Sequence, residues 1–263
     1  MLHGLDRLVA RIEAGGLDEA AVYRMERLHR PPALGPVADG VLLCPICGTR
    51  AMRFLPFGLS RRRNAACPGC GSVERHRFLW LFLVAETGIL RRRLKVLHTA
   101  AEPALAERLR PQVNLRYATV DRFDPYADIT ADLTDLPLAD GSIDLLISSH
   151  VIEHVRDDRA ALRELARVVR PGGSGVLMTP FDPRIARTPE DPSVDTPAKR
   201  LAAYGHPFHY RIYGADLVDR LAEAGFEAEI VTTAGFLTAH QRRKYRINRN
   251  NLLLLRRKRS AVR

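Results

Sequence analysis

Four cysteines arranged in two Cys-x-x-Cys pairs are the residues of this sequence whose spacing indicates chemistry most directly. The pairs are Cys44 with Cys47 and Cys67 with Cys70, and each has a proline after its first cysteine and a glycine after its second. Two such pairs can supply the four thiolates of a closed tetrahedral zinc site, whereas unrelated buried thiols or two disulfides are the simpler alternative. The glycines suit tight turns whose N–H groups face sulfur. We therefore predict a structural zinc site in a small module spanning residues 37–75.

The composition is typical of a globular protein, but the net charge is strongly positive. The chain has 263 residues, of which 46% are hydrophobic, and a formal net charge of +11. This length accommodates one large α/β domain and a small appendage. Every cysteine belongs to one of the two pairs, which favours a reducing compartment. The sequence shows neither a signal-peptide pattern at its start nor an apolar run of membrane-spanning length. We therefore predict a cytoplasmic protein without a membrane partner.

Arginine and lysine gather in four short runs. Such runs attract polyanions and make binding salt-dependent, so RNA or another polyanion is a candidate partner. A solvated basic face would explain the same runs equally well. They lie at residues 61–63, 91–93, 242–244 and 256–259.

Apolar periodicity divides the chain into an N-terminal helical part, the cysteine module and an alternating α/β part. Residues 1–36 contain two amphipathic helical patterns closed by two prolines, and residues 78–84 read as a buried helix. Strands that alternate with helices imply a mostly parallel sheet covered on both faces. The predicted strands are 94–98, 115–120, 143–148, 174–179, 227–232 and 250–255, and the predicted helices are 103–110, 157–170 and 214–225, the second ending at Pro171.

Two segments of the α/β part resemble class I S-adenosylmethionine-dependent methyltransferases. They are D-L-T-D-L-P-L-A-D-G-S-I-D-L-L-I-S-S-H-V-I-E-H-V at 132–155 and E-L-A-R-V-V-R-P-G-G at 164–173. The similarity covers residues 94–257 of a domain that we place at 76–263. Together with the two C-P-x-C-G pairs, it resembles bacterial methyltransferases that carry a zinc ribbon. The resemblance implies a Rossmann-like, seven-stranded sheet with the cofactor across the carboxyl ends of its early strands.

The resemblance also implies which residues hold the cofactor. Asp121 matches the acid that grips both ribose hydroxyls, with Arg122 beside it, and an ordinary turn aspartate is the alternative. Asp132 and Leu133 match the adenine-edge positions, although Asp132 could equally cap a helix or serve a loop. Ser149 falls where the sulfonium and the substrate meet.

The loop after the first strand of the sheet departs from the family pattern. The family has an acid followed by glycines there, whereas this chain has no glycine among Thr99, Ala100, Ala101, Glu102 and the two residues that follow. Small alanines would leave room for the cofactor if their φ angles are negative. Glu102 could replace the missing acid by meeting the cofactor's ammonium group. The departure also leaves a noncatalytic domain open.

Histidines provide the candidate catalytic groups. His150, Glu153 and His154 are spaced i, i+3, i+4 and could bind a metal with His209, but we expect Glu153 and His154 merely to cap the helix start. His206 and His209 are the best candidates for a general base.

Arg211 follows these histidines and could orient an anionic or carbonyl group; a packing role for His209 and Arg211 at a lid hinge is the alternative. We therefore expect methyl transfer to an oxygen or nitrogen of an unknown acceptor, with RNA or another anion as a candidate. The alternatives are a noncatalytic zinc- and nucleic-acid-binding protein and a small-metabolite enzyme whose ribbon is a lid.

Overall fold

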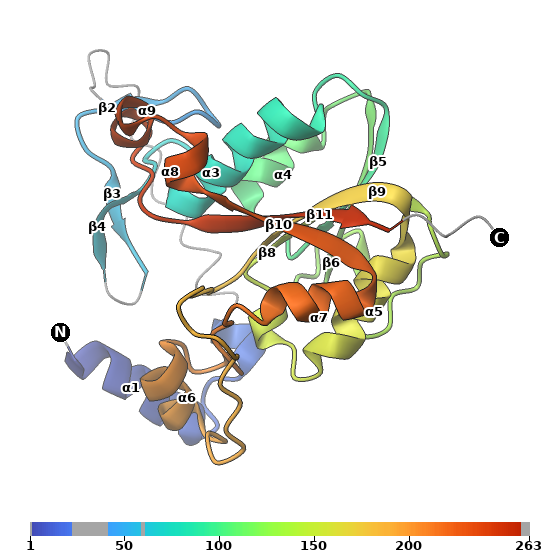
Figure 1. Ribbon diagram of the computed structural model, residues 1–263. Helices are drawn as coiled ribbons and strands as arrows, with labels where there is room; N and C mark the ends of the chain where they lie inside the picture. The colour runs from blue at the N-terminus through green and yellow to red at the C-terminus, as the bar shows by residue number, and fades with distance from the viewer. Residues whose placement is uncertain (1, 23–41, 59–60, 259–263) are drawn as a thin grey trace.

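A seven-stranded sheet forms the centre of the protein. The computed structural model describes residues 2–22, 42–58 and 61–258 (Figure 1). Six of the seven strands run in the same direction, and the seventh, β11 (Asn251–Arg257), runs antiparallel to both of its neighbours. The predicted Rossmann-like architecture is thus confirmed. In spatial order the strands are β7 (Ile129–Thr130), β6 (Leu115–Asp121), β5 (Leu94–Thr99), β8 (Ile143–Ser149), β9 (Val169–Met178), β11 (Asn251–Arg257) and β10 (Phe226–Thr232).

Both faces of the sheet are covered, because successive residues of its central strands point into different apolar clusters. In β8, Leu145 and Ile147 join one cluster and Leu146 joins the other. The first cluster includes α3 (Glu74–Phe82), the π-helical turn η1 (Leu83–Thr87) and α4 (Pro103–Leu109). The second includes α5 (Asp158–Val168) and α7 (Leu217–Ala224). This burial on both sides explains the continuous apolar runs of the parallel strands.

The junction of α5 and β9 corrects the sequence-based boundaries. The helix was expected to continue to residue 170, but it ends at Val168, and Val169 already pairs with Ile143 of β8. The strand pairing shifts register after this point, and Pro171 lies within the shifted segment, where a missing N–H is tolerated. The strand β7 was not predicted, since two residues carry no periodic signal.

The cysteine module consists of two short hairpins that share the core of α3. The hairpins pair β1 (Leu42–Leu43) with β2 (Arg50–Ala51) and β3 (Leu55–Phe57) with β4 (Arg62–Ala66). Phe54 is buried in the cluster that also contains α3. The buried Arg77 of α3 donates to the carbonyls of Ala65 and Tyr245 and so ties the module to the end of α9 (Ala239–Lys244). The module and the sheet therefore share one core.

The N-terminal helix packs on a segment far away in the sequence. In Figure 1, α1 (Leu2–Glu13) lies beside α6 (Pro197–Tyr204). Ile12 and Val22 contact Phe208, which follows α6. The second predicted helical pattern is described only from Glu19 to Val22, and its closing prolines and the predicted boundary at residue 36 lie outside the described residues. No helix in the described part of the chain is long and apolar enough to cross a membrane.

Candidate functional site

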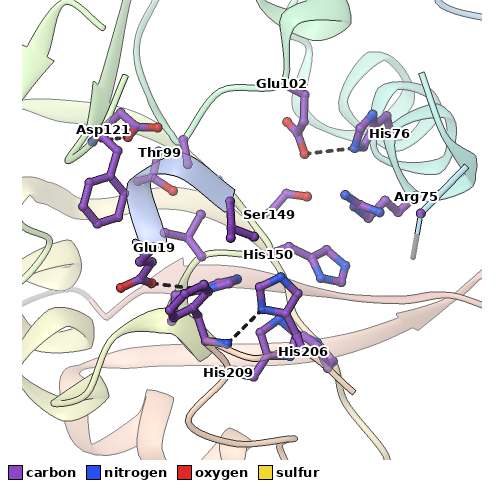
Figure 2. Close-up of a pocket in the computed structure, with 18 of the residues that line it drawn as sticks. Glu19, Arg75, His76, Thr99, Glu102, Asp121, Ser149, His150, His206 and His209 are labelled. Atoms are coloured by element: carbon purple, nitrogen blue, oxygen red, sulfur yellow. Dashed lines mark hydrogen bonds and ion pairs between the residues drawn. The ribbon is translucent and has the colours of Figure 1, made fainter. Parts of the chain in front are cut away.

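A cavity of about 1110 Å³ opens at the carboxyl ends of β5, β6 and β8. The sheet supplies its floor through residues such as Thr99, Asp121 and Ser149 (Figure 2). The cysteine module supplies a wall through Phe57 and Gly71, while the N-terminal segment and the loop after α6 line the remaining side. The cysteine module is therefore part of the site rather than a remote appendage.

The four cysteine sulfurs come together as predicted. Cys44 Sγ lies 3.7 Å from Cys70 Sγ, Cys47 Sγ lies 3.6 Å from Cys67 Sγ, and all four ligand atoms lie within 4.8 Å of one another. Zn–S bonds of about 2.3 Å in a tetrahedron place the sulfurs roughly 3.8 Å apart, so this donor set fits a tetrathiolate zinc site.

The two pairs adopt the same turn. Gly48 and Gly71 have φ angles of 77° and 72°, and each donates its N–H to the carbonyl of the first cysteine of its pair, at 2.9 Å. This left-handed conformation explains why glycine follows each pair.

The loop between β5 and α4 places Glu102 in the cavity. The Glu102 carboxylate is buried, with Oε2 3.0 Å from Nε2 of His98 and Oε1 3.6 Å from Nε2 of His76. Burial alone would raise the pKa of Glu102, but these two histidines outweigh it and keep the pKa below its ordinary value. Glu102 is therefore an ionised carboxylate at the position where the sequence suggested an acid for the cofactor's ammonium group.

Two alanines of this loop differ from their expected arrangement. Ala100 lines the cavity, but its φ angle is 44° rather than negative, so the loop adopts at this residue a conformation that favours glycine. Ala101 was expected to contact the cofactor and does not line the cavity.

The side of the cavity next to β6 and β7 carries the residues expected around ribose and adenine. Asp121 is buried at the end of β6, and its Oδ1 accepts the N–H groups of Phe123 and Asp124. Asp132 Oδ1 accepts the Thr134 N–H at 2.9 Å, and its Oδ2 pairs with Arg122 at 3.2 Å. Leu133 lines the cavity with these residues. The structure thus brings Asp121, Arg122, Asp132 and Leu133 together.

The end of β8 shapes the centre of the cavity. His150 has a φ angle of 54°, and its Nδ1 lies 3.0 Å from Oε1 of Glu153. Burial and the charge of Arg75 lower the pKa of His150, so its ring is neutral at physiological pH. Glu153 is buried and accepts the Thr179 hydroxyl at 2.9 Å.

The expected cap role of Glu153 and His154 is wrong. Asp157 caps α5 by accepting the Ala160 N–H, and neither Glu153 nor His154 caps a helix.

Three histidines from two segments form a cluster at the edge of the cavity. His154 belongs to the turn η2 (Ile152–His154), and His206 and His209 follow α6. The rings of His206 and His209 are 4.5 Å apart between centroids, and one ligand atom from each of the three lies within 4.8 Å of the others. Such a trio could hold a transition metal, and it differs from the i, i+3, i+4 set suggested by the sequence.

His209 is partly buried, and its Nδ1 has no hydrogen-bond partner among the described residues. Burial outweighs the attraction of Glu153 and lowers the pKa of His209 to about 3, so its ring is neutral.

Arg211 does not perform the orienting role suggested by the sequence. Its buried guanidinium donates to the carbonyls of Val155 and Arg156 at 2.6 and 2.7 Å and pairs with Glu190 at 3.1 Å. It does not line the cavity. This arrangement corresponds to the alternative packing role, in which Arg211 fastens the segment after α6 to the start of α5.

Sequence reasoning missed the contribution of α3. Arg75 and His76 line the cavity from the start of this helix, directly after the second cysteine pair. His76 Nδ1 accepts the Val73 N–H at 3.4 Å, which leaves Nε2 to face Glu102. Burial, assisted by the charge of Arg75, lowers the pKa of His76 well below its ordinary value. The available signal was the run of four polar residues, Glu74 to Arg77, at the start of an otherwise apolar helix.

Two of the four basic runs converge on a second pocket of about 450 Å³, which we call the basic pocket. It lies between β4 of the cysteine module and α9, and Glu74 is the acidic residue in its lining. Arg62 lines both this pocket and the larger cavity. The cationic side chains are Arg62, Arg63, Arg242, Arg243 and Arg246.

The Rossmann-like part of the chain is similar in sequence to known methyltransferases. Residues 69–177 match the family model described as a methyltransferase domain. A probable S-adenosylmethionine-dependent methyltransferase of Mycolicibacterium smegmatis is 38% identical over 40% of this chain and 37% of its own length. One of Mycobacterium tuberculosis is 42% identical over 36% of this chain and 31% of its own length. The chain spans about a third of the length of these relatives.

Solved structures with similar folds share less sequence. A methyltransferase of Mesorhizobium loti is 20% identical with a TM-score of 0.46, covering 66% of this chain and 98% of that chain. The 1,6-didemethyltoxoflavin-N1-methyltransferase of Burkholderia thailandensis is 15% identical with a TM-score of 0.45, covering 71% of this chain and 83% of that chain.

Proposed function

We propose that the protein transfers the methyl group of S-adenosylmethionine to an oxygen or nitrogen nucleophile, with a structural zinc ion in the cysteine module. The observation that carries this proposal is the buried Asp121 carboxylate, which faces the cavity at the end of β6. The cofactor supplies an electrophilic methyl on a positive sulfonium. The residues of the chain hold the cofactor, align the acceptor and take the acceptor's proton. The products are the methylated acceptor, S-adenosylhomocysteine and a proton.

The residues of the cavity fit the polar groups of this cofactor. Asp121 would accept hydrogen bonds from the ribose hydroxyls, and Asp132 and Leu133 would bind the adenine edge. Glu102 would face the ammonium group, with Thr99 and Ser149 between the two ends (Figure 2). Buried carboxylate atoms of this kind are stable when a ligand supplies the matching donor.

Neutral histidines at the opposite wall suit the proton-accepting step. His150, His206 and His209 line the cavity, and the lowered pKa values leave His150 and His209 deprotonated at physiological pH. A neutral imidazole can accept the proton released by the acceptor, but a pKa of about 3 makes His209 a weak base, so we assign the base role to His150 or His206. Tetrathiolate coordination by Cys44, Cys47, Cys67 and Cys70 would hold the adjacent wall in place.

For the acceptor, the basic pocket favours a polyanion such as RNA. Phosphates bound at Arg63 and Arg243 would lie next to Arg62, which reaches both pockets. A second candidate is a small metabolite, because the cysteine module, the N-terminal segment and the loop after α6 all line the larger cavity. In that case the module is a lid.

Calorimetry with S-adenosylhomocysteine tests the proposal. The zinc-loaded protein should bind this product, and elemental analysis should find one zinc per chain. Incubation with labelled cofactor and either RNA or a metabolite extract then distinguishes the two acceptor classes by the fraction that acquires label. If the protein does not bind S-adenosylhomocysteine at millimolar concentration, the proposed enzymatic function is contradicted and the noncatalytic alternative is favoured.

A further inference from the structure

Arg75 presents an unsatisfied positive charge to the cavity. Its side chain is partly buried, its Nε is buried without a hydrogen-bond partner, and its guanidinium forms no ion pair with any residue that the structure describes. A guanidinium does not lose its proton in proteins, so it cannot escape this situation by becoming neutral. Burying a charge is unfavourable unless an anion meets it. The site is therefore suited to an anionic ligand group beside α3.

Glu102 provides the opposite charge at the same end of the cavity. Its Oε1 is buried and has no hydrogen-bond partner among the described residues. In Figure 2, Glu102 and Arg75 lie on the side of the view away from Asp121, with Thr99 and Ser149 between. An acceptor atom and a cationic donor that both lack hydrogen-bond partners, at the same end of the cavity, are complementary to a group that carries both an ammonium and a carboxylate.

We propose that Arg75 binds the α-carboxylate at the methionine end of the cofactor while Glu102 binds its α-ammonium. The inference rests on the proposed function and extends it to a residue outside the sheet. Two other arginines that line the cavity already have partners, since Arg62 pairs with Glu74 and Arg122 pairs with Asp132. The helix that follows the cysteine module thus completes the cofactor site.

Two nucleoside ligands separate this role from recognition of an anionic acceptor. S-adenosylhomocysteine has the amino-acid end, whereas 5′-deoxy-5′-methylthioadenosine has the same adenine, ribose and sulfur without it. Calorimetry should show that Arg75→Gln weakens the binding of S-adenosylhomocysteine by about tenfold to a hundredfold, which is the scale of lost charge-assisted hydrogen bonds. The affinity for methylthioadenosine should be unchanged. Arg75→Lys should retain part of the affinity, because it keeps the charge but loses the forked geometry.

Arg122→Gln is the matched control, because Arg122 lines the adenine side of the same cavity. It should change the affinities of both ligands by the same factor. If Arg75→Gln weakens both ligands equally, or neither, the inference is overturned while the proposed function stands. If the wild-type protein binds neither ligand, the proposed function itself fails. Thermal melting of each variant separates a local change from unfolding.

Discussion

His76 Nε2 lies 3.6 Å from Oε1 of Glu102, and this contact joins the helix after the second cysteine pair to the loop after the first strand of the sheet. Gly71 and Cys70 of the same cysteine turn also line the cavity. The proposed zinc site and the proposed cofactor site are therefore separated by only a few residues of one continuous segment. A change in one should be measurable in the other.

Removing the metal should weaken cofactor binding. A chelator or Cys67→Ser would release the turn that leads into α3, and Arg75 and His76 would lose their fixed positions. We expect the affinity for S-adenosylhomocysteine to fall about tenfold or more, as measured by calorimetry alongside the zinc content. Adding zinc back to the chelated wild-type protein should restore it. A metal-free protein that stays folded and binds equally well would contradict the coupling.

Removing the charge of Asp121 should weaken the binding of both nucleoside ligands. In Asp121→Asn the remaining oxygen can still accept the Phe123 and Asp124 N–H groups, so the turn is retained while the carboxylate is lost. The expected loss is about tenfold for S-adenosylhomocysteine and for methylthioadenosine alike, because both contain the ribose. Asp124→Asn, at a residue that does not line the cavity, is the control. Unchanged affinity in Asp121→Asn would refute the ribose assignment.

Acidification should destabilise the protein partly through His76. The pKa of His76 lies well below 6.5 in the folded state, because burial disfavours the charged ring, whereas the unfolded chain binds a proton below about pH 6.5. The contribution of neutral His76 to the unfolding free energy is therefore fully present above about pH 6.5. It is lost as the pH falls from there toward the folded-state pKa. Between about pH 7.5 and 5.5, the unfolding free energy should decrease in both proteins. The decrease should be about 1 kcal/mol smaller in His76→Gln than in wild type, as measured by urea denaturation.

Two features keep this measurement specific. The lowered pKa of Glu102 means that this carboxylate stays ionised over the same interval. His240→Gln, at an exposed position of α9, is a control that should leave the pH dependence as in wild type. Equal losses in wild type and His76→Gln would show that His76 is not the responsible group.

Reversing charges in the basic pocket should reduce RNA binding. Arg63 and Arg243 come from different basic runs but line one pocket, so Arg63→Glu with Arg243→Glu should weaken retention of a single-stranded RNA. The slope of log affinity against log salt should become shallower by about 1 to 2 units. Arg91→Glu with Arg93→Glu is the matched control, since that run precedes β5 at the end of the sheet away from the cavity. Equal effects of both pairs would indicate only a general loss of charge.

The sequence predicted the features that depend on local pattern. The long apolar runs of β5, β6 and β8 were recognisable because both faces of these strands are buried, and the cysteine spacing anticipated the cluster of four sulfurs. The position of Arg75 at the cavity depends on how the cysteine module packs on α3, which no local pattern encodes. The packing role of Arg211 was foreseen only as an alternative, since its carbonyl partners lie in a distant segment.

The left-handed conformation of Ala100 has a consequence for protein engineering. The surrounding fold holds this residue at a φ angle of 44°, which for alanine costs about 1 kcal/mol relative to glycine. Restoring glycine there would relieve that strain without changing the course of the backbone. A bulkier or β-branched side chain at the same position would add backbone strain directly after the carboxyl end of β5. Natural variation at this position should therefore be confined to the smallest residues.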